Sequence, residues 1–71
     1  MIVTHDVEPG ASTAQDMVDG MPPKTHRIVR IRRYEFNAMQ MLKDILSLPH
    51  VHTAAITRHT KDEIHYHVIS K

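Results

Sequence analysis

The hydrophobic and polar positions of residues 25–71 follow three successive patterns, and the first of them predicts a strand over residues 26–34. This segment is rich in β-branched and aromatic residues and contains neither glycine nor proline. Successive side chains of a strand point to opposite faces, so Val29 and Ile31 share one face. The other face carries Ile28, Arg30, Arg32 and Tyr34. The alternation therefore predicts a strand with an apolar face and a basic face.

The second pattern has a helical period and predicts a helix over residues 37–48. The apolar residues at that spacing are Ala38, Met41, Leu42, Ile45 and Leu48. Asn37 is a favourable N-cap, Gln40 stands where a capping box needs it, and Phe36 and Met41 occupy the positions of a hydrophobic staple. Pro49 ends the helix. We expect the exposed flank of this helix to comprise Met39, Lys43 and Leu46.

The third pattern predicts a β-hairpin of strands 51–59 and 63–70, whose register is open to two alternatives. A three-residue loop pairs His59 with Glu63 and sorts the apolar side chains onto one face. That face carries Ala54, Ile56, Ile64, Tyr66 and Val68, and the opposite face carries Thr53, Thr57, His59, Glu63, His65 and His67. A two-residue turn at Lys61 and Asp62 places Ile56 beside His67 and mixes both faces. Burial favours the register that sorts the side chains, so we predict the three-residue loop, with His52 opposite Ser70 and facing the helix.

Residues 1–24 differ in composition from the rest of the chain. Gly20, Pro22 and Pro23 interrupt regular structure, and a short helix at 13–19 would be capped by Ser12 or Thr13. Residues 1–8 alternate weakly and could add an edge strand, whereas disorder is the alternative for the whole segment. The prediction is an α+β fold. A β-α-β-β domain over residues 25–71 packs one amphipathic helix on a three-stranded sheet, preceded by a flexible or loosely packed acidic arm.

Size, charge and cysteine content narrow the class of protein. The 71 residues allow one small domain, and the absence of cysteine excludes disulfides and thiol chemistry. Residues 1–24 carry four acidic residues and one basic residue, whereas residues 25–71 carry eight basic and four acidic ones. The N-terminus lacks the features of a secretory signal, and no apolar run approaches the ~20 residues that cross a bilayer. We therefore expect a cytoplasmic protein without membrane contact.

A homodimer is expected from the open edges of such a sheet. The helix that leads through a Leu-Pro end into a strand, at residues 42–49, loosely resembles half of a ferredoxin-like or ACT-type fold. Such a half leaves unpaired strand edges. A symmetric dimer covers them with one repeated contact, so we expect a second copy as one partner.

The seven histidines raise the question of a metal site. His65 and His67 lie two apart on a strand and point the same way, and His59 and Glu63 are expected beside them at the hairpin tip. Ligating histidines usually need an orienting acceptor, and few carboxylates are close in sequence. We therefore predict no metal and no cofactor. The less favoured alternative is a metal site with the candidate ligands His59, Glu63, His65 and His67. Enzymatic activity is not expected either, since no glycine-rich phosphate loop or nucleophile motif occurs.

The functional prediction is a small non-enzymatic protein that regulates or inhibits a macromolecular partner, most naturally another protein. Small accessory factors of phages and mobile elements have this make-up. The expected partner-binding residues are Arg30, Arg32, Tyr34, His65 and His67 on the sheet, with Met39, Lys43 and Leu46 on the helix. One alternative is nucleic-acid binding by the same basic, histidine-rich sheet face, because arginine pairs with phosphate and tyrosine stacks on bases. A histidine-based metal-binding protein is the second alternative.

Overall fold

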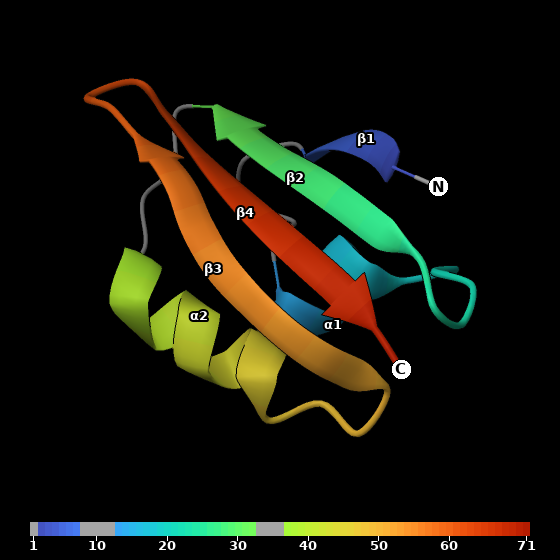
Figure 1. The fold of residues 1–71 in the computed structure, drawn as a ribbon. Coiled ribbons are helices and arrows are strands. Elements are labelled where there is room, and N and C mark those ends of the chain that lie inside the picture. Colours follow the sequence, from blue (N-terminus) through green and yellow to red (C-terminus); the bar gives the residue numbers. More distant parts are fainter. Residues whose placement is uncertain (1, 8–12, 33–36) are drawn as a thin grey trace.

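The described residues form one sheet of four strands with two helices packed on it (Figure 1). The computed structural model describes residues 2–7, 13–32 and 37–71. Along the chain these form β1 (Ile2–Val7), α1 (Ala14–Val18), β2 (His26–Arg32), α2 (Ala38–Leu46), β3 (Val51–His59) and β4 (Glu63–Ser70). The strand order is β1-β2-β4-β3. β1 is parallel to β2, whereas β4 is antiparallel to both β2 and β3.

The predicted α+β fold is confirmed: α2 packs on the three antiparallel strands β2, β4 and β3. The parallel strand β1, which the sequence left open, extends this sheet at β2. Figure 1 shows both helices on the same side of the sheet. Because β4 lies between β2 and β3, it carries the centre of both faces, and its burial alternates at every residue from Glu63 to Ser70.

The hydrophobic core lies between the two helices and one face of the sheet. Val29 and Ile31 of β2 are fully buried, as their alternation predicted, and so is Tyr66 of β4. The Tyr66 hydroxyl donates a hydrogen bond of 2.9 Å to the carbonyl oxygen of Ala38, the first residue of α2. The other buried hydrophobic residues described are Met17, Val18, Ala38, Met41, Ile45, Val51, Ile64 and Val68.

The start of α2 is set by Asn37, as the sequence predicted. Its side-chain oxygen accepts hydrogen bonds from the backbone N–H groups of Met39 and Gln40, at 3.0 and 3.1 Å. The Gln40 side chain bonds to Asp44 at 3.0 Å, one turn further on, instead of turning back to the cap. The helix ends at Leu46, two residues earlier than expected, and Phe36 of the predicted staple lies outside the described residues.

The short helix α1 contributes two of the fully buried core side chains, Met17 and Val18. Its N-cap Thr13 forms a capping box with Asp16. Arg27 of β2 is itself buried and donates hydrogen bonds through one terminal nitrogen to the carbonyl oxygens of Met17 (3.2 Å) and Asp19 (2.8 Å). The buried arginine therefore ties the end of α1 to the sheet, in a segment for which the sequence left disorder as an alternative.

The hairpin of β3 and β4 combines both registers that the sequence offered. In its middle, Ala54 pairs with Val68 and Ile56 with Tyr66, as the three-residue loop predicted. At the tip the backbone N–H of Thr60 donates to the carbonyl of Glu63, which leaves only Lys61 and Asp62 in the turn. The register shifts between Ile56 and Arg58, where Thr57 is the extra residue of a β-bulge.

This bulge overturns the predicted pairing of His59 with Glu63. His59 instead pairs with Ile64, and Arg58 pairs with His65. Since one extra residue moves every later side chain to the opposite face, Arg58 joins the face of His65 and His59 leaves it. The hairpin thus has a two-residue turn and also keeps its apolar side chains on one face. The sequence alone assigns these two features to different registers.

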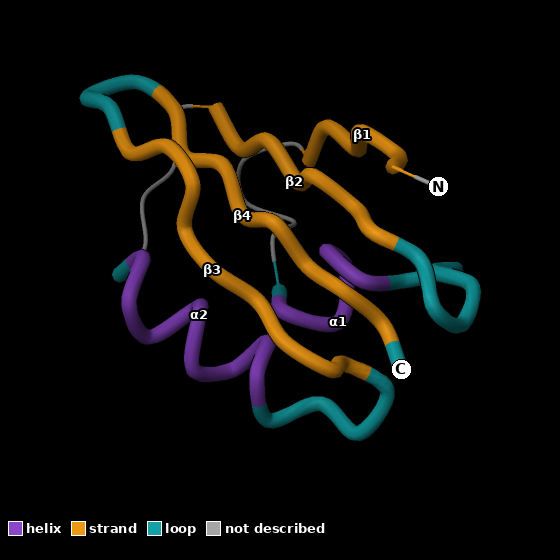
Figure 2. Tube along the Cα trace, in the orientation of Figure 1, coloured by secondary structure: helices purple, strands orange, loops and turns teal. Residues whose placement is uncertain are grey.

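A second register shift separates Val51 and Thr53, and it corrects the position predicted for His52. Val51 pairs with Ser70, and His52 is the extra, exposed residue. The Ser70 side chain is buried and donates a hydrogen bond of 2.6 Å to the carbonyl oxygen of Pro22. The C-terminal end of β4 is therefore fixed, at the opposite end of the sheet from the hairpin turn (Figure 2).

Candidate functional site

The sheet face opposite the helices is the candidate site, and we call it the open face. Side chains of directly paired residues lie on the same face, so the register identifies its members. Arg30 pairs with His65 and Ile28 with His67, whereas Ala55 of β3 pairs with His67 from the other side. The described side chains of the open face on these three strands are His26, Ile28, Arg30, Arg32, Thr53, Ala55, Arg58, Glu63, His65, His67 and Ile69.

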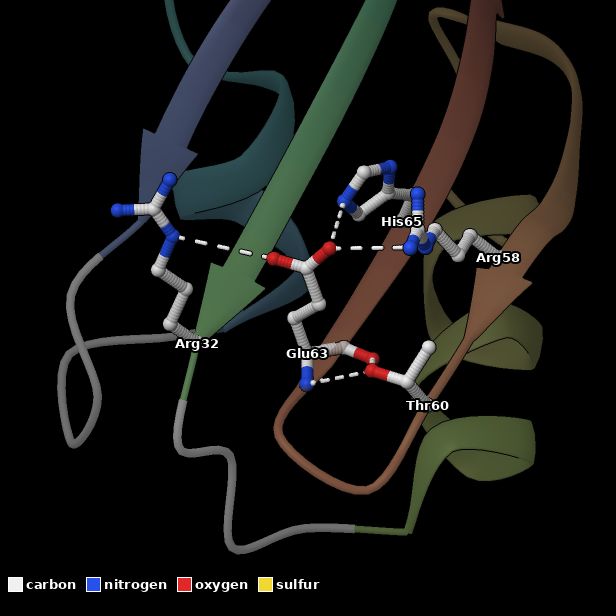
Figure 3. Close-up of polar contacts among 5 residues, drawn as sticks. All are labelled: Arg32, Arg58, Thr60, Glu63 and His65. Atoms are coloured by element: carbon white, nitrogen blue, oxygen red, sulfur yellow. Dashed lines mark hydrogen bonds and ion pairs between the residues drawn. The ribbon is translucent and has the colours of Figure 1, made fainter.

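Near the hairpin turn, Glu63 is the centre of a charged cluster (Figure 3). Its carboxylate lies 3.9 Å from Arg32 Nε, 3.6 Å from Arg58 Nε and 3.1 Å from His65 Nε2. Arg32 and Arg58 approach it from opposite sides, from β2 and β3 (Figure 3). The Thr60 hydroxyl accepts a hydrogen bond from the Glu63 N–H at 3.2 Å.

This charged cluster orients its arginines more than it stabilises the fold. The side chains of Arg32 and Arg58 are each 62 % exposed and that of Glu63 is 26 % exposed. Ion pairs this open to water contribute about 0–1 kcal/mol each. One carboxylate shared between two arginines and a histidine also leaves donors of both guanidinium groups available, because each has five. The cluster can therefore accept a further anionic group.

At the other end of the open face, His26 and His67 form a pair. The nitrogens His26 Nδ1 and His67 Nε2 are 3.2 Å apart, and the ring centroids are 5.2 Å apart with the planes tilted by 54°. The two residues are diagonal neighbours, because Ile28 pairs with His67 and His26 pairs with Ile69. Both histidines and both isoleucines are half-buried. This end of the open face is thus a mixture of apolar side chains and imidazoles.

Four of the predicted partner-binding residues are brought together on the open face: Arg30, Arg32, His65 and His67. Tyr34, the fifth residue predicted for this face, lies outside the described residues. The sequence missed Arg58, which reaches this face only because of the bulge at Thr57. It also missed His26 as a site residue, although the alternation that placed Arg30 on this face places His26 there too.

The predicted helix flank is exposed but lies elsewhere. Met39 is 57 % exposed, Leu46 is 46 % exposed, and Lys43 between them is exposed as well. Since α2 covers the core face of the sheet, this flank and the open face lie on opposite sides of the sheet (Figure 1). The predicted residues therefore belong to two separate surfaces.

The predicted alternative metal cluster is not assembled. His59 leaves the face of Glu63 and His65, and His67 lies beside His26 instead. Within residues 2–7, 13–32 and 37–71, no group of three or more histidine, aspartate or glutamate side chains is placed to hold a metal ion. His65 instead forms a hydrogen bond to Glu63 within the charged cluster.

Comparison with known protein families, curated proteins and solved structures finds no match to this chain. None of the helices in the described part of the chain is long and apolar enough to span a membrane.

Proposed function

We propose that this chain is a small non-enzymatic regulatory or inhibitory protein that binds an acidic surface of another protein through its open face. The observation that carries the proposal is the one-sided covering of the sheet. Both helices pack on the core face, and the described side chains of the opposite face on β2, β4 and β3 include Arg30, Arg32 and Arg58 with one glutamate among them. Complementary charge guides such a partner and fixes its orientation.

The composition of the open face favours a protein over a nucleic acid. Ile28, Ala55 and Ile69 lie on the same face as the arginines, so a partner can bury apolar area as well as pair charges. Sheets that bind single-stranded RNA rely on exposed aromatic side chains for stacking. On the described open face there is no tyrosine or phenylalanine, and Tyr66 belongs to the core.

The test is capture of the partner from cells of the source organism with three forms of the chain. The first is the unaltered protein, and the second is Arg32→Gln with Arg58→Gln, which removes two charges from the open face. The third, Lys24→Gln with Lys71→Gln, removes two charges from exposed positions elsewhere. We expect the second form alone to lose the captured protein. The same protein retained by the second form, or lost equally by both, would overturn the proposal.

The salt dependence of the captured complex distinguishes a protein partner from the nucleic-acid alternative. Binding of a polyanion releases condensed counterions, so its affinity falls by orders of magnitude between about 50 and 200 mM salt. A protein partner held partly by apolar contacts responds far less. Loss of the captured material after nuclease treatment, together with a steep salt dependence, would support nucleic-acid binding and contradict the protein partner.

We further propose that two copies of the chain associate. The proposal is supported by β3, which is an edge strand of the described sheet, and by Met39 and Leu46 on the helix packed against it. Light scattering across a concentration series tests it. A mass of 8.2 kDa at all concentrations would contradict a dimer.

A further inference from the structure

The His26–His67 pair places two ring nitrogens at a distance that suits either a hydrogen bond or two ligands of one metal ion. Two nitrogens that bind one metal ion are separated by a distance fixed by the metal–nitrogen bonds and the angle between them. With zinc–nitrogen bonds of about 2.0–2.1 Å, a tetrahedral angle separates the nitrogens by about 3.3–3.4 Å. A square-planar right angle separates them by about 2.8–3.0 Å at the same bond lengths. The 3.2 Å between His26 Nδ1 and His67 Nε2 is closer to the tetrahedral value.

We propose that His26 and His67 form a two-histidine Zn²⁺ site on the open face. The observed separation corresponds to an angle of about 99–106° at the ion, within reach of a tetrahedral site after small ring movements. Neutral imidazole is a preferred zinc ligand. The described residues add no third ligand to this pair, so water or groups from a second molecule complete the coordination.

The sheet holds both ligands in place before the ion arrives. His67 stands on the central strand β4, with β2 on one side and β3 on the other. His26 is the first residue of β2 and pairs with Ile69. Half-buried isoleucines directly opposite each histidine restrict the rings. This preorganisation lowers the entropy that binding costs and favours a defined site over loose capture by scattered surface histidines.

Binding requires a change of tautomer together with small ring movements. In the paired state one ring donates its N–H to the other, and that hydrogen must leave its nitrogen before both nitrogens can bind an ion. When both rings ligate zinc, the hydrogens lie on the outward nitrogens, His26 Nε2 and His67 Nδ1. Both rings stay neutral, and no net proton is released if both were neutral before.

Isothermal titration of the full chain with ZnCl₂, in a non-chelating buffer at neutral pH, tests the site. The variants His26→Asn and His67→Asn each remove one ligand, and His52→Asn and His65→Asn serve as matched controls. His52 is exposed on β3, and His65 lies on the same face as His67 but bonds to Glu63. Outer-shell partners of ligating histidines are already worth about 10–100-fold in affinity, so we expect at least tenfold weaker binding without either ligand. The controls should stay within about threefold.

Nuclear magnetic resonance of the imidazole nitrogens gives a readout that does not depend on how the variants fold. Zinc added to the unaltered chain should shift His26 Nδ1 and His67 Nε2 and leave the other rings in place. Equal shifts of all seven histidines, or controls that lose affinity as strongly as the ligand variants, would overturn the proposal. Zinc binding is measured on the isolated chain, so its outcome is independent of the proposed protein partner.

Discussion

Replacement of the buried Arg27 by methionine should remove a large part of the stability of this protein. The side chain is 8 % exposed on the core face of β2, and it donates to the carbonyl oxygens of Met17 and Asp19. Its Nε is buried and has no hydrogen-bond partner among the described residues. Methionine keeps an unbranched apolar stem of similar length but supplies no donor, so Arg27→Met isolates the guanidinium contribution.

The expected loss follows from the groups left behind. Hydrogen bonds from a charged donor contribute about 1.5–3 kcal/mol each, and the 3.2 Å bond to Met17 is the weaker of the two. The Asp19 carbonyl is part-buried and can turn to water, whereas the Met17 carbonyl is buried, and such an orphaned acceptor costs about 1–3 kcal/mol. The substitution also removes the cost of burying a charged group whose Nε has no described partner. This gain offsets part of the lost free energy of unfolding. We therefore expect a net loss of about 3 kcal/mol.

A loss of this size is readily measured in so small a domain. Seventy-one residues have a typical unfolding free energy of about 4–11 kcal/mol, and 3 kcal/mol lowers the melting temperature by about 12–24 °C. Urea and thermal unfolding followed by circular dichroism provide the comparison, with Arg32→Met as control because that side chain is 62 % exposed. Hydrogen exchange should also become faster in α1. If Arg27→Met matches the control within about 0.5 kcal/mol, the argument that Arg27 ties α1 to the sheet is wrong.

Three further substitutions test single features of the fold by urea unfolding. Tyr66→Phe deletes the hydroxyl that bonds to Ala38 and should cost about 1 kcal/mol, and an unchanged midpoint would contradict this. Asn37→Ala should cost about 1 kcal/mol by removing the cap of α2 while Asn37→Asp keeps it, so equal losses for both would refute the capping role. Gly20 has φ +69° and open space around its missing Cβ, so Gly20→Ala should cost about 1–2 kcal/mol through backbone strain alone. A stabilised Gly20→Ala variant would contradict that strain.

Strict alternation explains why β2 and β4 could be predicted closely from the sequence. In β4 every second residue is buried, so Ile64, Tyr66 and Val68 identify the core face without knowledge of any neighbour. The helix α2 could be predicted equally well, because Asn37 marks its start and the apolar stripe marks its buried side. These features depend on local chemistry and on a period that a single segment displays.

The bounds of β3 were predicted as 51–59, but its pairing with β4 could not be, because the two register shifts leave no mark in the sequence. Bulges are often signalled by glycine, and neither Thr57 nor His52 is a residue of that kind. The shift at Thr57 becomes evident only when β3 is paired with β4. The apolar pairs in the middle of the hairpin then require one register, and the two-residue turn at its tip requires another. The His26–His67 pair shows the same limit: alternation gives the face of each histidine, but only the pairing of β2 with β4 makes them neighbours.

The two ends of the open face are far enough apart to be tested separately and close enough to share one partner. Glu63 and His67 are four residues apart on β4, which is about 14 Å at 3.4 Å per residue. Substitutions more than about 10 Å apart usually act additively on stability, so variants of the charged cluster should leave zinc binding by His26 and His67 unaltered. A typical protein interface covers about 800 Å² on each side, an area that reaches both ends. If both proposals hold, any factor by which zinc alters the affinity for the partner must equal the factor by which the partner alters the affinity for zinc.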